Sequence, residues 1–169
     1  TLYSGFEVPL AVRVESDGEV TVPEGLKVTA ELSGEAVDGL QILALGNDDG
    51  VFRGRLPSPS GTGAAELVIT AEGEDFHRRR VQAVNVLPAV GAALDESGRR
   101  VTLVAEHPRL GHDNTRFEAD LLGQSLEVAP ADARRWSLEI PPQEDEVSRP
   151  LRISAVATID GNETRWNLP

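Results

Sequence analysis

The most concentrated group of metal-binding side chains in this sequence is one short polar run. Asn47, Asp48 and Asp49 precede Gly50. Calcium needs several oxygen ligands close together, and neighbouring carboxylates on a turn can supply them. The run does not align with an EF-hand loop, because leucines fall at the first and twelfth ligand positions. Two interpretations stay open: a calcium site formed by these three residues, or a hairpin turn in which Gly50 has a positive φ angle and an aspartate side chain caps the backbone.

A second acidic run extends from Glu144 to Glu146. Such a run is typical of a solvated loop. A calcium site built from loops of both halves of the chain is a further hypothesis, which the sequence alone does not test.

The other reactive side chains show no catalytic spacing. His107 and His112 are not arranged as in the HExxH motif, His77 stands apart from them, and the chain has no cysteine. We therefore interpret the histidines as surface residues. Gly123 and Ser125 begin a nucleophile elbow, but its closing glycine is missing. The sequence predicts no catalytic residue, no enzymatic activity and no cofactor other than the calcium of the first hypothesis.

The overall charge excludes several classes of function. The chain of 169 residues has 16 Lys and Arg against 28 Asp and Glu, which gives a net charge of -12. An acidic chain binds nucleic acids and anionic membranes poorly. The only basic cluster, Arg78 to Arg80, is short, and it fits an edge strand protected against aggregation or paired with nearby acids. No apolar run reaches the roughly 18 residues of a membrane span. We predict no nucleic-acid partner and no membrane insertion by this segment.

Alternation of apolar and polar residues is the main structural signal. Apolar residues recur at every second position in several stripes: Leu10, Val12 and Val14; Val28, Ala30 and Leu32; Leu67, Ile69 and Ala71; Val101, Leu103 and Ala105; Leu151, Ile153 and Ala155. Turn signals such as Asp160-Gly161-Asn162 separate the stripes, and no amphipathic helical pattern lies between them. The pattern predicts an all-β fold made of antiparallel β-sandwiches.

Pro88 interrupts this pattern, because a proline cannot donate a hydrogen bond within a sheet. The alternation then begins again. We predict two tandem sandwiches, residues 1–88 and residues 89–169, each near the size at which one core is stable alone.

The few aromatic residues are in phase with the apolar stripes. Trp136 is in phase with Leu138, and Trp166 is in phase with Leu168. This favours core packing over stacking on a sugar ring. Exposure of either tryptophan would instead favour carbohydrate binding.

One stretch of the first half has a distinctive pattern. An Asp-Gly turn leads into a strand with an aromatic residue and a glycine, and an alternating strand, a glycine and a phenylalanine follow. The matching residues are Asp49, Gly50, Phe52, Gly54, Leu67, Ile69, Ala71, Gly73 and Phe76. The pattern resembles the immunoglobulin-like modules that follow von Willebrand factor A domains in bacterial envelope proteins. The resemblance implies two tandem Ig-like or fibronectin-III-like sandwiches.

The resemblance also implies a place in the cell. We expect a periplasmic or cell-surface stalk or spacer within a larger, membrane-anchored bacterial protein. It would be non-catalytic and monomeric, and it would contact an envelope protein or other domains of the same parent chain. The alternative is a module that binds carbohydrate or another envelope component through exposed aromatic residues of the second half.

Overall fold

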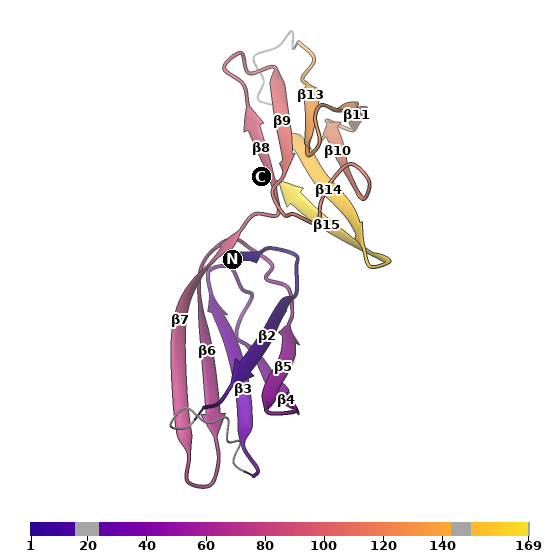
Figure 1. The fold of residues 1–169 in the computed structure, drawn as a ribbon. Helices are drawn as coiled ribbons and strands as arrows, with labels where there is room; N and C mark the ends of the chain where they lie inside the picture. The colour runs from indigo at the N-terminus through magenta and orange to yellow at the C-terminus, as the bar shows by residue number, and fades with distance from the viewer. Residues whose placement is uncertain (16–23, 143–149, 169) are drawn as a thin grey trace. The chain divides into compact units, whose positions relative to one another are not determined.

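The computed structural model describes residues 1–15, 24–142 and 150–168. Every regular element in these ranges is a β-strand, so the all-β prediction is confirmed. The described residues contain no helix long and apolar enough to cross a membrane. The chain divides into two compact units, Thr1–Leu87 (unit 1) and Pro88–Pro169 (unit 2), which Figure 1 shows. That each unit folds independently stays a prediction.

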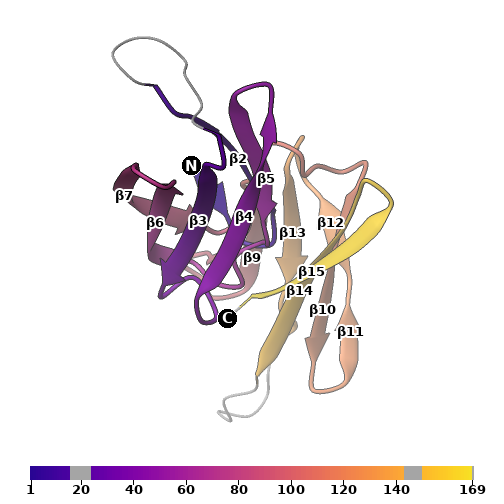
Figure 2. The same cartoon turned by 90° about the horizontal axis from the view of Figure 1, so that it is seen from below.

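Unit 1 is built on one seven-stranded sheet. Its strands are β1 (Leu2–Tyr3), β2 (Val8–Arg13), β3 (Lys27–Gly34), β4 (Gln41–Asp48), β5 (Val51–Leu56), β6 (Gly63–Glu72) and β7 (His77–Leu87). The order of neighbours is β1-β7-β6-β3-β4-β5-β2. Only β1 and β7 pair in parallel, and the other neighbours are antiparallel. Figure 2 shows β6, β3 and β4 side by side.

Strand β4 carries this sheet from one layer to the other. Its first part, Gln41–Leu45, pairs with β3, and its end, Gly46–Asp48, pairs with β5. The crossing leaves no room for a side chain at Gly54 of β5. A Cβ atom there would lie 2.6 Å from Cδ2 of Leu45 and 2.8 Å from Cδ2 of Leu43. The two leucines therefore fill the space above Gly54, and a larger residue would force the layers apart.

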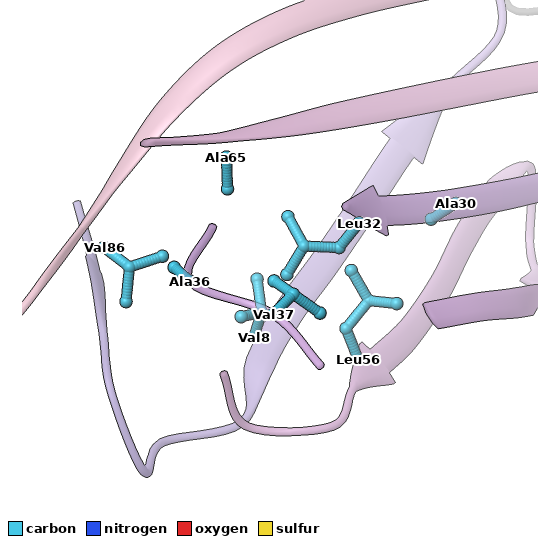
Figure 3. Packing of buried hydrophobic residues seen from close by; sticks show 8 residues of the cluster. All are labelled: Val8, Ala30, Leu32, Ala36, Val37, Leu56, Ala65 and Val86. Atoms are coloured by element: carbon cyan, nitrogen blue, oxygen red, sulfur yellow. The ribbon is translucent and has the colours of Figure 1, made fainter. Parts of the chain in front are cut away.

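The core of unit 1 lies between the two layers. In Figure 3, Val8 of β2 and Leu56 of β5 lie close to Leu32 of β3. Ala65 of β6 and Val86 of β7 belong to the same cluster. The two ends of the strand order thus contribute to one core, which shows that the sheet is folded over on itself.

A second cluster of unit 1 surrounds Phe52, which is 2% exposed. Val28 of β3 and Leu45 of β4 pack against it in the same cluster. The predicted alternation is found here, because Val28, Ala30 and Leu32 are all buried while Lys27 is exposed. Period-two alternation therefore identified the buried face of β3 correctly.

Unit 2 contains two separate four-stranded sheets. Its strands are β8 (Val90–Leu94), β9 (Arg100–Ala105), β10 (Thr115–Leu121), β11 (Gln124–Leu126), β12 (Val128–Pro130), β13 (Arg135–Glu139), β14 (Leu151–Ile159) and β15 (Asn162–Leu168). One sheet has the order β12-β13-β9-β8 and the other β11-β10-β14-β15. Figure 1 shows β8 and β9 in one layer and β10, β14 and β15 in the other.

These orders are those of the immunoglobulin sandwich. In unit 2, β8, β9, β13 and β12 correspond to strands A, B, E and D, and β10, β14 and β15 correspond to C, F and G. In unit 1, β2, β5 and β4 take the places of B, E and D, and β3, β6 and β7 those of C, F and G. The predicted Ig-like fold class is therefore confirmed. The units differ at one edge: β8 pairs with β9, whereas no described strand occupies the corresponding place beside β2.

The buried rings of Trp136 and Phe117 lie in the unit 2 core, and the ring of the exposed His112 packs on Trp136. Trp136 of β13 is 5% exposed. The ring centroid of Phe117 lies 4.8 Å from that of Trp136, and the ring centroid of His112 lies 4.5 Å from it. The prediction that Trp136 belongs to the core is confirmed.

Three hairpins among the described strands have the same two-residue turn. The turns are Asp49-Gly50, Leu122-Gly123 and Asp160-Gly161, with φ angles of 50° and 83°, 54° and 82°, and 51° and 80°. Positive φ at both positions is type I′ geometry, which favours Asp or Asn followed by Gly. The hairpin predicted at Asp160-Gly161 is confirmed. Leu122 is the exception, because a leucine adopts this conformation unfavourably.

The two buried aromatic residues give a test of the two units. Phe52→Ala and Trp136→Ala should each lower the free energy of unfolding by roughly 3 to 5 kcal/mol, because each removes a buried ring and leaves a cavity. If the units fold independently, each substitution moves only the unfolding transition of its own unit. Chemical denaturation followed by circular dichroism and tryptophan fluorescence measures both transitions.

The control is Leu94→Ala, since Leu94 is 60% exposed and its truncation should change stability by less than about 0.5 kcal/mol. One shared transition that shifts equally in both aromatic variants would contradict independent folding.

Candidate functional site

The candidate calcium residues lie at the end of the hairpin between β4 and β5. Asp48 pairs with Val51, so Asp49 and Gly50 form the turn, and Gly50 has a positive φ of 83°. The backbone N–H of Gly50 donates a hydrogen bond of 3.0 Å to Oδ1 of Asn47. The run thus has the backbone of a hairpin turn, but the side chain that caps it is an asparagine and not the expected aspartate.

Two of the three side chains of this run leave the strand in opposite directions. Asn47 and Asp48 are consecutive in β4, so their side chains leave opposite faces of the strand. Oδ2 of Asp48 lies 3.4 Å from Nε of Arg53. Within the described ranges, no three or more His, Cys, Asp and Glu side chains are grouped so that they could hold a metal ion. The other acidic run, Glu144 to Glu146, lies outside the described residues. Calcium binding by Asn47, Asp48 and Asp49 stays a prediction.

The histidines have three different surroundings. His77 is exposed at the start of β7. His112 packs on Trp136, and its Nε2 lies 3.1 Å from the carbonyl oxygen of Arg135. His107 is half-buried in unit 2, so it is less accessible than the other two histidines, which are exposed.

The surroundings of His107 favour its neutral form. Its Nδ1 accepts a hydrogen bond of 3.0 Å from the backbone N–H of Arg109, and this requires an unprotonated nitrogen. Burial is the main cause that lowers the pKa of His107, and the positive charges of Arg109 and Arg134 lower it further. Arg134 also donates a hydrogen bond to the carbonyl oxygen of His107. The arrangement fixes the loop after β9 and leaves this ring nitrogen no role as a proton acceptor for a substrate.

An ion-pair network covers the outer face of β10, β14 and β15. Nη1 of Arg165 lies 2.9 Å from Oε2 of Glu118, and Nε of Arg116 lies 3.4 Å from Oε1 of the same carboxylate. The hydrogen bond from Arg165 is the largest cause that lowers the pKa of Glu118. Both arginines pair with Val156, which is 0% exposed, so their aliphatic stems shield it from water. The lowered pKa therefore reflects surface packing and not a catalytic cleft.

The two tryptophans are not equally accessible. Trp136 is buried and has no face available for a ligand. Trp166 pairs with Ala155 and therefore lies on the inner face of β15, but it is half-buried because β15 is at the edge of its sheet. A carbohydrate site on an exposed aromatic residue would depend on Trp166.

The basic cluster lines a groove that the sequence analysis did not predict. Arg78 pairs with Ala71 and Arg80 pairs with Ile69, so both arginines lie on the inner face of β7, and Arg79 lies on the outer face. The groove lies between β7 and β2 and has a volume of about 530 Å³. We call it the edge groove; its apolar lining includes Leu10, Val12, Leu67 and Ile69, and Arg78 and Arg80 stand on the β7 side.

A sequence signal for the edge groove exists. The arginines occupy inward positions of a strand whose later inward positions, Val84 and Val86, are apolar. Charged residues at inward positions indicate that this part of the sandwich is open to water.

The calcium prediction can be tested by thermal unfolding with about 5 mM calcium and with EDTA. A site with a dissociation constant of about 0.1 mM would add roughly 2 kcal/mol, which is a rise in Tm on the order of 10 °C for a domain of this size. The variant with Asp48→Asn and Asp49→Asn should lose that rise. Equal Tm values of the unchanged chain in calcium and in EDTA would contradict the prediction.

The second test concerns the pH dependence of unit 2. The folded-state pKa of His107 lies below the ordinary value of 6.5, so the unfolded chain takes up a proton more readily than the folded chain. The free energy of unfolding is therefore expected to fall as the pH falls below about 6.5 and through the folded-state pKa. His107→Gln keeps a hydrogen-bond acceptor and does not titrate, so it should flatten this slope. Chemical denaturation at a series of pH values measures both slopes, and parallel slopes would show that His107 is not the cause.

No family model and no curated protein matches this chain. Among solved structures, it is similar to the BSP domain of a biofilm-associated protein, with 15% identity and a TM-score of 0.28 over 84% of this chain and 24% of that chain. It is also similar to the titin domains Z1Z2 solved in complex with telethonin, with 11% identity and a TM-score of 0.33 over 98% of this chain and 87% of that chain. The chain thus spans about a quarter of the biofilm-associated structure, and similarity at these TM-scores identifies no function.

Proposed function

We propose that this chain is a non-catalytic structural or protein-interaction segment, a stalk or spacer, of a larger bacterial cell-envelope protein. The periplasm or the cell surface is its proposed location. The parent protein would carry a von Willebrand factor A domain, a proposal supported by the resemblance of residues 48 to 86. The partner would be another envelope protein or another domain of the parent chain, and the segment itself would be monomeric.

The Ig-like strand order of both units carries this proposal, and the described groups with a shifted pKa have structural roles within it. Shifted pKa values commonly mark catalytic sites. Here the backbone N–H of Arg100 is the main cause that lowers the pKa of Asp95, whose carboxylate also accepts a hydrogen bond from Ser97 in the exposed turn before β9. Glu118 belongs to the surface network and His107 to a loop. Each shift therefore has a local structural cause and needs no reaction to account for it.

A second candidate function is binding of carbohydrate or another envelope component. The partial exposure of Trp166 on the edge strand β15 favours it. An aromatic ring at a sheet edge can stack on an apolar ligand face.

Parallel binding assays distinguish the two candidates. The immobilised chain is incubated with solubilised bacterial envelope proteins and, separately, with a glycan array, and retained proteins are identified by mass spectrometry. The expected result is saturable retention of a protein that is unchanged by Trp166→Ala, with no glycan bound.

Two results would contradict the proposal. Glycan binding that is lost in Trp166→Ala and kept in Trp166→Phe would support the second candidate. Turnover of a peptide, ester or glycan substrate that is lost on substitution of one carboxylate would show that the chain is an enzyme.

A further inference from the structure

We propose that the edge groove binds an extended peptide segment of a partner protein, which adds a strand along β7, with apolar side chains toward the groove and acidic side chains on the outer face, beside Arg79. The inference rests on the proposed protein-interaction function, and it names the chemistry of the partner.

The backbone of β7 provides the first argument. On one side β7 pairs with β6 from His77 to Val86. On the other side β1 pairs only with Val86 and Leu87, so the edge from His77 to Asn85 has no strand partner among the described residues. The unpaired N–H and C=O groups of such an edge are a template for an additional strand.

Comparison of the two units gives the second argument. In unit 2, β8 pairs with β9 from Val90 to Leu94 and so covers that edge of the sandwich. In unit 1, β2 pairs only with β5 in the described structure, and the short β1 lies beside the end of β7 instead. The edge groove opens between these two edges, and no strand formed by the described residues covers either of them along the groove.

The groove itself is suited to side chains of an extended peptide. Leu10, Val12, Leu67 and Ile69 line it and remain half-buried, unlike the fully buried residues of the nearby core. Its volume of about 530 Å³ lies within the range of roughly 300 to 1,000 Å³ that is usual for ligand sites. A strand places every second side chain on one face, so alternate apolar residues would cover these four side chains together.

Charge decides what kind of peptide fits. The protein carries a net charge of -12, yet three consecutive arginines lie along this edge. In the described ranges, none of Arg78, Arg79 and Arg80 forms an ion pair, and Arg78 lies over the ring of Phe76 at 5.6 Å from its centroid. A peptide with carboxylates between its apolar residues would complement this local positive charge.

The same charges argue against a second copy of this chain as the occupant. Pairing of β7 with β7 of another copy would bring two arginine clusters together, and like charges on neighbouring strands are destabilising. The arginines can therefore prevent self-association of an open edge while admitting an acidic strand.

Synthetic peptides of about nine residues, long enough to cover the free edge of β7, test the proposal. The probes are fluorescein-labelled peptides in which valine alternates with glutamate, valine with lysine, or serine with glutamate. Fluorescence anisotropy with the whole chain should show saturable binding of the valine–glutamate peptide and much weaker binding of the other two. Hydrogen exchange measured by NMR should show protection of backbone amides between His77 and Asn85 when that peptide binds.

Variants of the chain and of the peptide provide the controls. Arg79→Glu should weaken binding of the valine–glutamate peptide by about fivefold or more, because Arg79 lies on the outer face with the glutamates. Arg152→Glu makes the same change in net charge on unit 2, and this variant should bind as the unchanged chain does. In a strand added to one edge, only every second backbone N–H group of the peptide donates a hydrogen bond to β7. N-methylation of those nitrogens should therefore abolish binding, and N-methylation of the alternate nitrogens should not. Thermal unfolding of each variant checks that it is folded.

Several outcomes would overturn the proposal. Equal binding of the valine–glutamate and valine–lysine peptides would show that the arginines do not select an acidic peptide. Unchanged hydrogen exchange of the β7 amides on peptide binding would show that no strand is added along β7. A dimer in sedimentation experiments that the peptide dissociates would show that the occupant is a second copy. If the peptide fails to bind the unchanged chain but an envelope protein is still retained by the Arg79→Glu variant, only this inference fails. If no protein is retained by the unchanged chain, the proposed function fails.

Discussion

Burial of aliphatic side chains at every second strand position is the constraint on which this structure depends. With few aromatic residues, the layers must approach closely to leave no voids. In unit 1 this closeness is visible at Gly54, where two leucines of β4 occupy the space of a side chain. In unit 2 the space between the layers is filled instead by the rings of Trp136 and Phe117. The same Ig-like topology is therefore supported by two different kinds of core.

Alternating apolar residues and turn dipeptides, which are local features of the sequence, predicted most of the fold. Features that depend on the pairing of strands distant in the sequence were not predicted. Alternation identified the buried face of β3, and the dipeptide Asp160-Gly161 identified a hairpin. The change of pairing partner along β4, from β3 to β5, was not predictable, because it depends on where the strand crosses between the two layers and not on its own residue pattern. The edge groove was missed for a similar reason, since the inward position of Arg80 is defined only by its pairing with Ile69. The sequence also did not identify which side chain caps the Asp49-Gly50 turn, because Asn47 and the two aspartates are all able to accept this hydrogen bond, and the structure shows that Asn47 does.

The charged residues show how an acidic protein keeps such an architecture stable. Around β10, β14 and β15, arginines and glutamates form exposed pairs that shield Val156, so charge and apolar burial support each other. Along the edge of β7, Arg78 to Arg80 form no such pairs with other described residues. The two surfaces therefore differ in whether their arginines are paired within the described part of the chain.

The parallel pairing of β1 with β7 has a mechanical consequence. Leu2 pairs with Val86 and Tyr3 with Leu87, and the backbone N–H of Ser4 donates to the carbonyl oxygen of Leu87 at 3.0 Å. Because the two strands run in the same direction, opposite pulls at Thr1 and at Pro88 load these hydrogen bonds together in shear. The remainder of unit 1 bears tension only after they break. In a stalk, this short ladder would set the force at which the first unit begins to open.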